Sequence, residues 1–461
     1  MQPVSEIPAD RAEQAELVNN DAPAHPSFAT ALRYWLKLGF ISFGGPAGQI
    51  AVMHTELVER RRWISERRFL HALNYCMLLP GPEAQQLATY IGWLMHGTWG
   101  GIAAGALFVL PSLFILMGLS WIYVAYGDTS LVSGFFTGVR PAVVAVVAYA
   151  VIRIGSRAVK NLATLAIALA AFAALLAGVH FALIVLGAGL LGYLGSKVWP
   201  ENFRAGGHAK HGSSAQRAPA AIIDDHHDIL AHTRPSAARF AVHLAVGLAL
   251  WIAPMAWLYA TQGWHGTHTQ MAWFFTQAAL LTFGGAYAVL PFVREHAIHT
   301  YGWLRPGQMI DGLALGETTP GPLIMVVAFV GFVGGYQATG AWSGAVWGCL
   351  VATYFTFLPS FLFILLGAPF IEQMRGELRL TAMLTGITAA VVGVIAHLAF
   401  FFGQQVFAAQ KPITQAWYDS VDWLAVSVAT VCFLALWRWK ADILHVVLVC
   451  GALGLLARLV L

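Results

Sequence analysis

Long apolar stretches separated by short polar ones dominate the pattern of this chain. Stretches such as 162–179 and 344–370 are long enough to cross the hydrocarbon core of a bilayer, which takes about 20 residues in a helix. Composition agrees, because only 10% of the residues are charged, whereas soluble proteins carry about 25%. The pattern therefore predicts an all-α polytopic membrane protein.

The pattern also repeats itself. SFGG at 42–45 returns as TFGG at 282–285, and PGP at 80–82 returns at 320–322, both 240 residues later without a gap. Two further matches are 248 residues apart: LPS from Leu110 and from Leu358, and GVRPAVVAVV from Gly138 with GITAAVVGVI from Gly386. Such self-similarity predicts two homologous halves.

Each half contains two segments that glycine and proline interrupt, followed by four apolar helices. In the first half the expected segments are 28–58, 66–97, 100–125, 131–155, 161–178 and 181–198. In the second half they are 269–293, 305–337, 341–370, 379–402, 420–438 and 441–460. Depending on whether the interrupted segments span the membrane, we expect about nine to thirteen crossings.

The domain division follows from these segments. We expect a disordered cytoplasmic tail (1–27), an N-terminal transporter repeat (28–199), a polar His-rich linker (200–236), a connecting transmembrane helix (237–261) and a C-terminal repeat (262–461). If each half crosses the membrane an even number of times, the single connecting helix turns the second half upside down. We therefore predict inverted repeats, an architecture of secondary transporters.

The distribution of lysine and arginine agrees with this topology except at one cluster. Five arginines lie between 54 and 68, where a fully crossing first segment would place them outside the cell. Discontinuous or re-entrant helices at the FGG and PGP motifs remove the conflict, because the cluster then stays inside. We favour that interpretation.

The interrupted segments are the candidate binding site. Proline ends a helix and glycine adopts conformations closed to other residues, so a break exposes N–H groups at the start of the next half-helix. Each N-terminus carries roughly half a positive charge, so four that converge supply about +2, which matches a dianion. The alternative is that neighbouring helices simply relieve four kinks. The candidate residues are Gly44, Gly45, Pro46, Pro80, Gly81, Pro82, Gly284, Gly285, Pro320, Gly321 and Pro322.

Ionisable residues within apolar segments are further candidates, because they are costly there and usually functional. Arg140 is a candidate anion ligand, with a structural ion pair as the alternative. Glu83, Glu317 and His397 are candidate proton carriers. Glu83 also suits a first-turn acid that stabilises a helix N-terminus, and His397 also suits a packed, hydrogen-bonded histidine.

Neither a cofactor nor a metal site is predicted. The linker places His208, His211, His226, His227 and His232 near Asp224, Asp225 and Asp228, but this spacing fits no specific metal site, and we favour a soluble linker. The four cysteines lie in apolar runs without metal-ligand spacing and are interpreted as packing residues.

With its paired FGG and PGP motifs and LPS downstream in each half, the chain resembles the chromate ion transporter (CHR) family in its long two-domain form. The resemblance covers about residues 28–198 and 269–460. It implies a multi-pass secondary transporter of the cytoplasmic (inner) membrane that exports chromate and thereby gives chromate resistance, with sulfate as a related oxyanion. The family motif residues are Phe43, Gly44, Gly45, Pro80, Gly81, Pro82, Phe283, Gly284, Gly285, Pro320, Gly321 and Pro322.

Two alternatives stay open at this point. A proton- or cation-coupled transporter of sulfate or another anion would share the architecture and differ in substrate and coupling. A membrane-embedded enzyme is disfavoured, because the sequence lacks HExxH, GxSxG and P-loop motifs. The expected partners are chromate, sulfate and membrane lipid, without nucleic acid, and a homodimer is one option for the assembly.

Overall fold

The computed structural model describes residues 23–43, 45–203, 221–224, 231–373, 381–408 and 420–460. Within these ranges the chain is almost entirely helical, as the apolar pattern predicts. Seven of the described helices are long and apolar enough to cross a membrane: Glu83–Tyr126, Ser130–Ala158, Phe181–Val198, Ala237–Gln262, Trp342–Glu372, Ala382–Phe407 and Ile443–Val460. Three shorter apolar helices accompany them: Leu162–Leu176, Leu323–Thr339 and Trp423–Arg438. The protein is a multi-pass membrane protein.

The first half begins with short helices around the motifs and continues with long ones. They are α2 (Phe28–Ile41), α3 (Gly45–His54), the π-helix η1 (Thr55–Arg60), α4 (Glu66–Leu78), α5 (Glu83–Tyr126), α6 (Ser130–Ala158), α7 (Leu162–Leu176), α8 (Phe181–Val198) and the short α9 (Pro200–Phe203). Polar side chains start several of these helices, since Ser27, Ser65, Thr129 and Asn161 each accept a hydrogen bond from a backbone N–H three residues later.

The second half has the same order of elements. After η2 (Ala231–Thr233) and the connecting helix α10 (Ala237–Gln262) come α11 (Thr267–Leu281), α12 (Ala286–Glu295), the π-helix η3 (His296–Thr300), α13 (Pro306–Thr318), η4 (Leu323–Met325), α14 (Val326–Thr339), α15 (Trp342–Gln373), α16 (Thr381–Phe407), α17 (Trp423–Arg438) and α18 (Ile443–Val460).

Helix breaks fall at the glycine- and proline-containing motifs. In each half one break precedes the helix after FGG and another precedes the helix after PGP. The helix α5 is also interrupted, because His96 and Gly97 leave helical geometry and Gly97 has a φ of +65°. The segments expected at 66–97 and 100–125 therefore meet at this kink.

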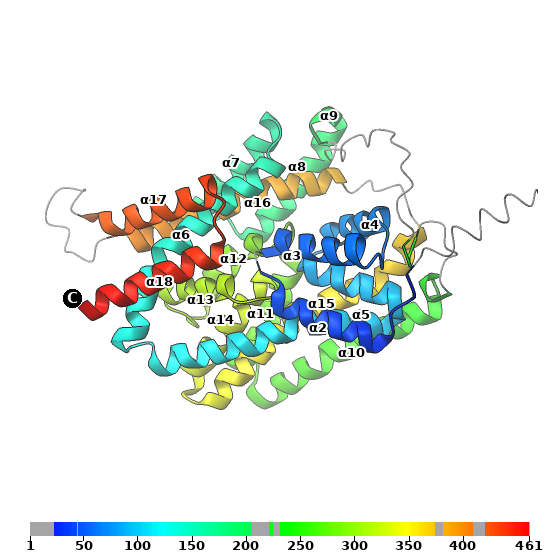
Figure 1. Cartoon of the computed structure of the whole chain (residues 1–461), viewed down its shortest axis with the longest axis horizontal. Helices are drawn as coiled ribbons and strands as arrows, with labels where there is room; N and C mark the ends of the chain where they lie inside the picture. Colours follow the sequence, from blue (N-terminus) through cyan, green and yellow to red (C-terminus); the bar gives the residue numbers. More distant parts are fainter. Residues whose placement is uncertain are drawn as a thin grey trace, which may run out of the picture.

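The helices gather into two bundles (Figure 1). One, which we call the terminal bundle, consists of the last three long helices of each half: α6, α7, α8, α16, α17 and α18. The other, the motif bundle, contains α2, α4, α5, α10, α11, α14 and α15. Between them, α12 packs on α16, and α13 packs on α6 and α18. The two halves thus contribute to both bundles rather than forming separate units.

Glycine contacts hold the terminal bundle together in a reciprocal pattern. Gly138 of α6 faces Gly454 of α18, and its repeat counterpart Gly386 of α16 faces Gly192 of α8. A Cβ added to Gly138 would lie 2.2 Å from the carbonyl oxygen of Cys450, and one added to Gly386 would lie 2.2 Å from that of Ala188. Such small residues let membrane helices approach closely.

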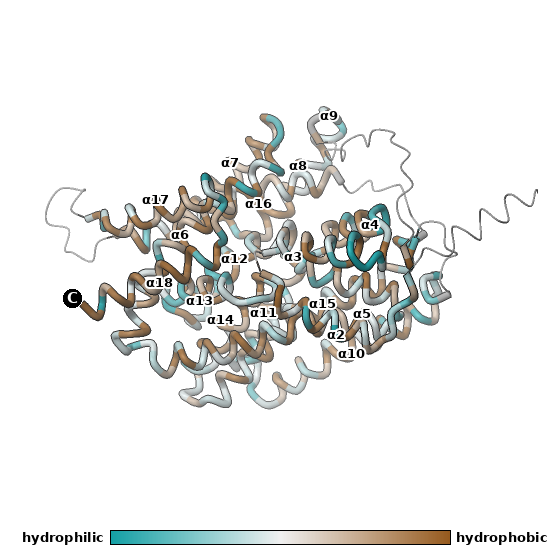
Figure 2. Tube along the Cα trace, in the orientation of Figure 1, coloured by the Kyte–Doolittle hydropathy of each residue, from teal (hydrophilic) through white to brown (hydrophobic). Residues whose placement is uncertain are grey.

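The outer surface is apolar where it faces lipid. Along α10, only Gly247 and Leu258 are buried, and most of its other leucine, valine and tryptophan side chains are exposed. Figure 2 shows apolar positions along the outer helices α7, α17 and α18, and hydrophilic positions gathered around α4. This distribution fits a protein whose solvent over most of its height is hydrocarbon.

One stretch of the linker lies against the start of α4. The N–H groups of Ile222 and Ile223 donate to the carbonyl oxygens of Arg62 and Trp63, at 3.0 and 3.1 Å. His232, from the predicted His-rich cluster, instead hydrogen-bonds the carbonyl oxygen of Trp93 at 3.1 Å. Outside the described residues lie most of the predicted N-terminal tail, residues 1–22, and the remaining histidines and two of the aspartates: His208, His211, Asp225, His226, His227 and Asp228.

Candidate functional site

The motif breaks of the two halves meet in two crossed loop pairs. The N–H of Gly321, in the second PGP, donates to the carbonyl oxygen of Ser42 at 2.8 Å. The N–H of Gly81, in the first PGP, donates to the carbonyl oxygen of Thr282 at 2.7 Å. Ser42 and Thr282 are the residues directly before FGG in the two halves. The FGG loop of each half therefore joins the PGP loop of the other half.

We call these contacts the first and second loop pairs. The first loop pair joins residues 42, 43 and 45 to 320–322, and the second joins residues 282–285 to 80–82. The pairs are equivalent under the 240-residue repeat, so exchanging the two halves converts one into the other. Two units related by a two-fold axis make reciprocal contacts of this kind.

Only glycine fits the centre of each PGP loop. Gly81 and Gly321 have φ values of +123° and +103°, a region that side chains with a Cβ rarely adopt. A Cβ on Gly81 would lie 2.3 Å from Ser360 Oγ, and one on Gly321 would lie 2.6 Å from Ser112 Cβ. The two PGP loops are therefore packed against the serine of the other half's LPS motif.

Three serine hydroxyls at the loop pairs are buried without a partner. Ser112 on α5, Ser360 on α15 and Ser42 before α3 are at most 1% exposed, and none of their Oγ atoms has a hydrogen-bond partner among the described residues. Buried polar groups are normally hydrogen-bonded, because an unpaired one costs about 1–3 kcal/mol. Hydroxyls at such positions are available to donate to a ligand that accepts hydrogen bonds.

Glutamine amides add polar atoms at both pairs. Gln49 of α3 donates from Nε2 to the carbonyl oxygen of Gly321 at 2.5 Å, and Gln86 of α5 donates from Nε2 to that of Pro80 at 2.8 Å. Gln85 donates to Thr89 Oγ1 at 3.0 Å. The side-chain oxygens of these glutamines have no partner within the described ranges.

Helices begin directly after the loops. Helix α3 begins at Gly45, α5 at Glu83 and α12 at Ala286, and the helix Leu323–Thr339 follows the second PGP. Pro82, Gly285 and Pro322 cap the last three without a side-chain hydrogen bond. Helix N-termini favour anions, because their first N–H groups lack partners within the helix. Together with the unpartnered hydroxyls, they form a set of donors suited to an oxyanion.

The candidate binding residues from the sequence are therefore gathered at the two loop pairs, with two exceptions. Gly44 lies outside the described residues, and Arg140 lies elsewhere. The residues that the structure places in the loop pairs or on the first turn beyond them are Gly45, Pro46, Pro80, Gly81, Pro82, Gly284, Gly285, Pro320, Gly321 and Pro322. That they bind substrate stays a prediction.

Arg140 forms an ion pair. Its Nε and Nη2 donate to Oδ1 and Oδ2 of Asp311, both at 2.9 Å, and the Tyr123 hydroxyl donates to Oδ2 at 2.9 Å. Asp311 is buried, so the bidentate arginine compensates its charge. This arrangement matches the structural alternative for Arg140, and a role in anion binding stays a prediction.

The three candidate proton carriers occupy different surroundings. Glu317 is buried three residues before the second PGP and accepts a hydrogen bond from the Tyr287 hydroxyl. Glu83 begins α5 directly after the first PGP, and no donor among the described residues hydrogen-bonds its carboxylate. His397, on α16, packs edge-on against Phe172 with ring centroids 6.3 Å apart. Each PGP loop thus has one carboxylate beside it.

Sequence reasoning missed a second arginine of α6. A Cβ added to Gly45 would lie 3.7 Å from Nη2 of Arg153. The positive charge of Arg153 also acts on Glu317 and Tyr287 from beyond ion-pair distance. In the sequence it belongs to the basic positions that indicate a cytoplasmic end, and no local signal separates it from them. The serines Ser112 and Ser360, by contrast, were marked by the repeated LPS.

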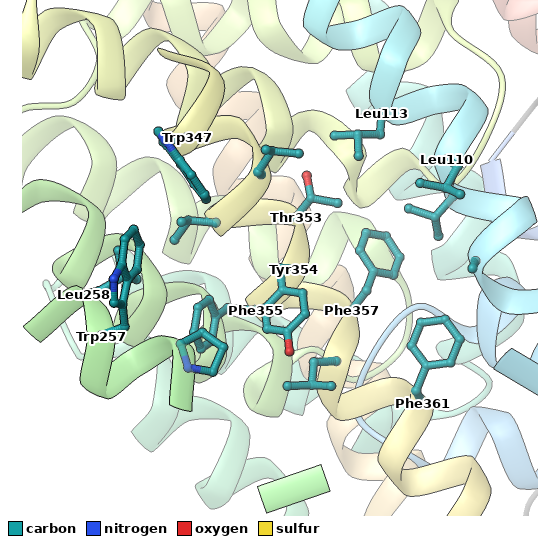
Figure 3. A pocket seen from close by; sticks show the side chains of 16 residues that line it. Leu110, Leu113, Trp257, Leu258, Trp347, Thr353, Tyr354, Phe355, Phe357 and Phe361 are labelled. Carbon is teal, nitrogen blue, oxygen red and sulfur yellow. The ribbon is translucent and has the colours of Figure 1, made fainter. Parts of the chain in front are cut away.

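One cavity among the described helices is lined almost entirely by apolar side chains. It measures about 640 Å³ and lies between α5, α10 and α15 (Figure 3). Tryptophan, phenylalanine and leucine side chains line it, and the hydroxyls of Thr353 and Tyr354 donate to the carbonyl oxygens of Cys349 and Leu250. A cavity with this lining suits a hydrocarbon chain better than an oxyanion.

Comparison with known proteins agrees with the motif pattern. The family model described as "Chromate transporter" matches residues 29–193 and again 269–455. The chain is 33% identical to the chromate transport protein of Pseudomonas aeruginosa over 94% of this chain and 93% of that protein. It is 30% identical to the probable chromate transport protein of Synechococcus elongatus, over 83% and 86% of the two chains.

A third relative, the chromate transport protein of Cupriavidus metallidurans, is 29% identical over 78% of this chain and 79% of its own length. No solved structure matches the chain. The family model covers most of both halves, including all four motif breaks. The chain therefore belongs to the chromate transporter family.

Proposed function

We propose that the protein is a secondary transporter that exports chromate across the cytoplasmic membrane and thereby gives chromate resistance. Three relatives that align with most of the chain are named as chromate transport proteins, one of them as probable. We place the oxyanion at the crossed loop pairs. The observation that carries this placement is the set of buried serine hydroxyls without partners beside the helix N-termini.

The chemistry of this set suits a tetrahedral dianion. Chromate oxygens accept hydrogen bonds, and both serine hydroxyls and backbone N–H groups donate them. Backbone donors at helix N-termini stabilise negative charge without a fixed ion pair, so the anion is held and can still leave. A transporter needs this balance, because substrate bound too tightly is not released.

We propose that transport occurs by alternating access, and the two-bundle arrangement supports this proposal. We propose that the halves are inverted repeats and that the terminal bundle moves against the motif bundle around the loop pairs. The reciprocal contacts Gly321 to Ser42 and Gly81 to Thr282 support a two-fold relation between the halves. In this proposal the site lies at the loop pairs, and movement of one bundle against the other changes which side of the membrane the site is open to.

Export can run on the membrane potential. A dianion that leaves a cell with a negative interior gains about 4.6 kcal/mol per 100 mV, twice the value for a single charge. Import would need coupled protons or cations. We therefore expect a membrane potential alone, negative on the side that holds chromate, to drive chromate toward the positive side.

Reconstituted protein tests this proposal. Proteoliposomes are loaded with chromate, and release is followed while voltage and pH gradients are imposed separately. We expect a potential that is negative inside to accelerate release. Release equal to that from protein-free liposomes, for chromate under every gradient, would refute the proposed function.

Matched serine variants test the placement of the site. Ser112→Ala removes a buried hydroxyl beside Gly321, and Ser427→Ala removes an exposed one on α17 that donates to the carbonyl oxygen of Trp423. A hydrogen bond to a charged ligand contributes about 1.5–3 kcal/mol, so Ser112→Ala should weaken chromate binding about tenfold or more. Ser427→Ala serves as the control. Equal binding by both variants would contradict the placement.

A sulfate transporter is the second candidate function. The proposed donors are hydroxyl and N–H groups, which fit any tetrahedral oxyanion of this charge. Competition decides between the two: excess sulfate should slow chromate release if both share one site. If sulfate moves at a high rate and chromate does not, the substrate assignment changes and the site remains.

A further inference from the structure

We propose that Arg153 is the cation that binds the transported oxyanion at the first loop pair, and that Glu317 competes with the oxyanion for this cation. The proposal rests on the proposed function and extends it, because it names the residue that recognises charge and the residue that links binding to protons. Neither residue's role follows from the shared motifs.

Position is the first argument. Arg153 reaches the start of α3, where a Cβ on Gly45 would meet its Nη2 at 3.7 Å. Gly45 belongs to the first loop pair, together with Gly321, whose N–H contacts Ser42. The guanidinium therefore lies beside the N-terminus of α3, one of the helix N-termini that we assign to the oxyanion.

The missing counterion is the second argument. Within the part of the chain that the structure describes, no carboxylate lies within ion-pair distance of Arg153, whereas Arg140 on the same helix is held by Asp311. An arginine near the end of a membrane helix that has no carboxylate within ion-pair distance is available to bind an anion. Its planar fork of N–H donors matches two oxygens of a tetrahedral oxyanion.

Glu317 supplies the competition. Its carboxylate is buried and accepts a hydrogen bond from the Tyr287 hydroxyl. Among the described residues, the titratable or charged groups that act on Glu317 are Tyr287, from α12, and Arg153, from α6. When ionised, Glu317 attracts the guanidinium; when protonated, it leaves the guanidinium to the oxyanion. Oxyanion binding is therefore accompanied by uptake of a proton on the Glu317 carboxylate.

The repeat shows that this arrangement belongs to the first loop pair alone. At the 248-residue offset, Arg153 corresponds to Phe401. At the 240-residue offset, Tyr287 corresponds to Ala47 and Glu317 to Met77. The second loop pair keeps the loops and the serine and lacks all three groups. The charge-recognising site is thus asymmetric on a symmetric scaffold.

Equilibrium binding of radiolabelled sulfate and of chromate to the purified full-length protein tests the proposal. Arg153→Ala should weaken binding of both oxyanions at least about tenfold, and Arg153→Lys should retain part of the affinity. Arg157→Ala, an exposed arginine one turn further along α6, is the matched control and should bind as the wild type does. Size-exclusion profiles establish that each variant is folded.

The pH profile gives a readout that a purely structural role would not change. Sulfate keeps its charge between about pH 8 and about pH 5, so wild-type affinity for sulfate should rise as the pH falls and Glu317 is protonated. Glu317→Gln should bind tightly at every pH with a flat profile. Wild-type-like affinity in both Arg153 variants, or a wild-type pH profile in Glu317→Gln, would overturn the proposal. If the wild type binds neither oxyanion, the proposed function fails first, and this inference fails with it.

Discussion

Helices α3 and α12 follow the two FGG motifs and are repeat equivalents, yet their packing differs. Helix α3 buries only Gln49 and Met53, whereas α12 buries every residue from Ala286 to Arg294. Helix α12 packs on α16 of the terminal bundle, and the more exposed α3 packs mainly on α5 and η1. Helix α12 is thus enclosed by its neighbours, whereas its repeat equivalent α3 is more exposed.

The cations at these two sides differ in the same way. Arg294 at the end of α12 stacks over the Phe401 ring at 3.7 Å from its centroid and pairs with Glu295 at 2.7 Å. Arg153, the repeat counterpart of Phe401, lies farther from an aromatic ring, at 5.9 Å from the centroid of Tyr149. Equivalent sides in unequal states are what alternating access requires of a repeated transporter. The same motif therefore has different surroundings in the two halves.

The largest effect on chromate flux is expected from replacing the central glycine of PGP, which both halves share. Gly321→Ala and Gly81→Ala each place a Cβ against a serine at a φ above +100°. Strain of about 1–3 kcal/mol from the backbone, added to the clash, should lower chromate flux in proteoliposomes more than about tenfold in both variants. Gly340→Ala is the control, because Gly340 has a φ of +65° and open space around it. Normal flux in one of the two PGP variants would contradict the prediction and show that transport does not require the glycine of that loop.

Thiol labelling tests the difference in exposure between α3 and α12 directly. Ala51→Cys on α3 introduces an exposed thiol, and Leu290→Cys on α12 introduces a buried one. The native cysteines of the chain are all buried, so background labelling is low. We expect a membrane-impermeant reagent to label position 51 at least about tenfold faster than position 290. Equal labelling rates at positions 51 and 290 would contradict the difference in exposure between α3 and α12.

Gln49 tests what joins α3 to the opposite half. Its Nε2 donates to the carbonyl oxygen of Gly321, and the repeat places Val289 at the equivalent position of α12. Gln49→Val therefore makes the first side resemble the second and leaves a buried carbonyl oxygen without this donor. The cost of about 1–3 kcal/mol should lower chromate flux about tenfold, while Val289→Ile serves as the control. Unchanged flux would show that this bond is dispensable.

The smallest effect on transport is expected at Arg140. Arg140→Gln leaves the buried Asp311 without its bidentate partner, which should lower the thermal unfolding temperature in detergent. The double variant Arg140→Gln/Asp311→Asn should recover most of that loss, because neither charge then remains unpaired. Retained chromate binding in the double variant would assign Arg140 to stability, whereas loss of binding with recovered stability would support the anion role that the sequence predicts.

Local chemistry explains why much of the fold was predictable. Proline and glycine end helices through their own backbone geometry, so the breaks at Pro80 and Pro320 could be placed without knowing their neighbours. The repeated LPS indicated that Ser112 and Ser360 belong to equivalent places. It did not indicate that each serine faces the PGP loop of the other half.

The amino-acid sequence by itself determined the helices, their interruptions and the duplication, because these depend on local geometry and on the length that hydrocarbon demands. Only the tertiary structure decided the partners: Gly321 with Ser42, Arg140 with Asp311, and Arg153 beside Glu317. These residues lie more than about 160 positions apart, and no periodicity records which distant side chains share a buried site. Packing thus decides which charged residues lie at the candidate site, while the repeated motifs determine its backbone scaffold.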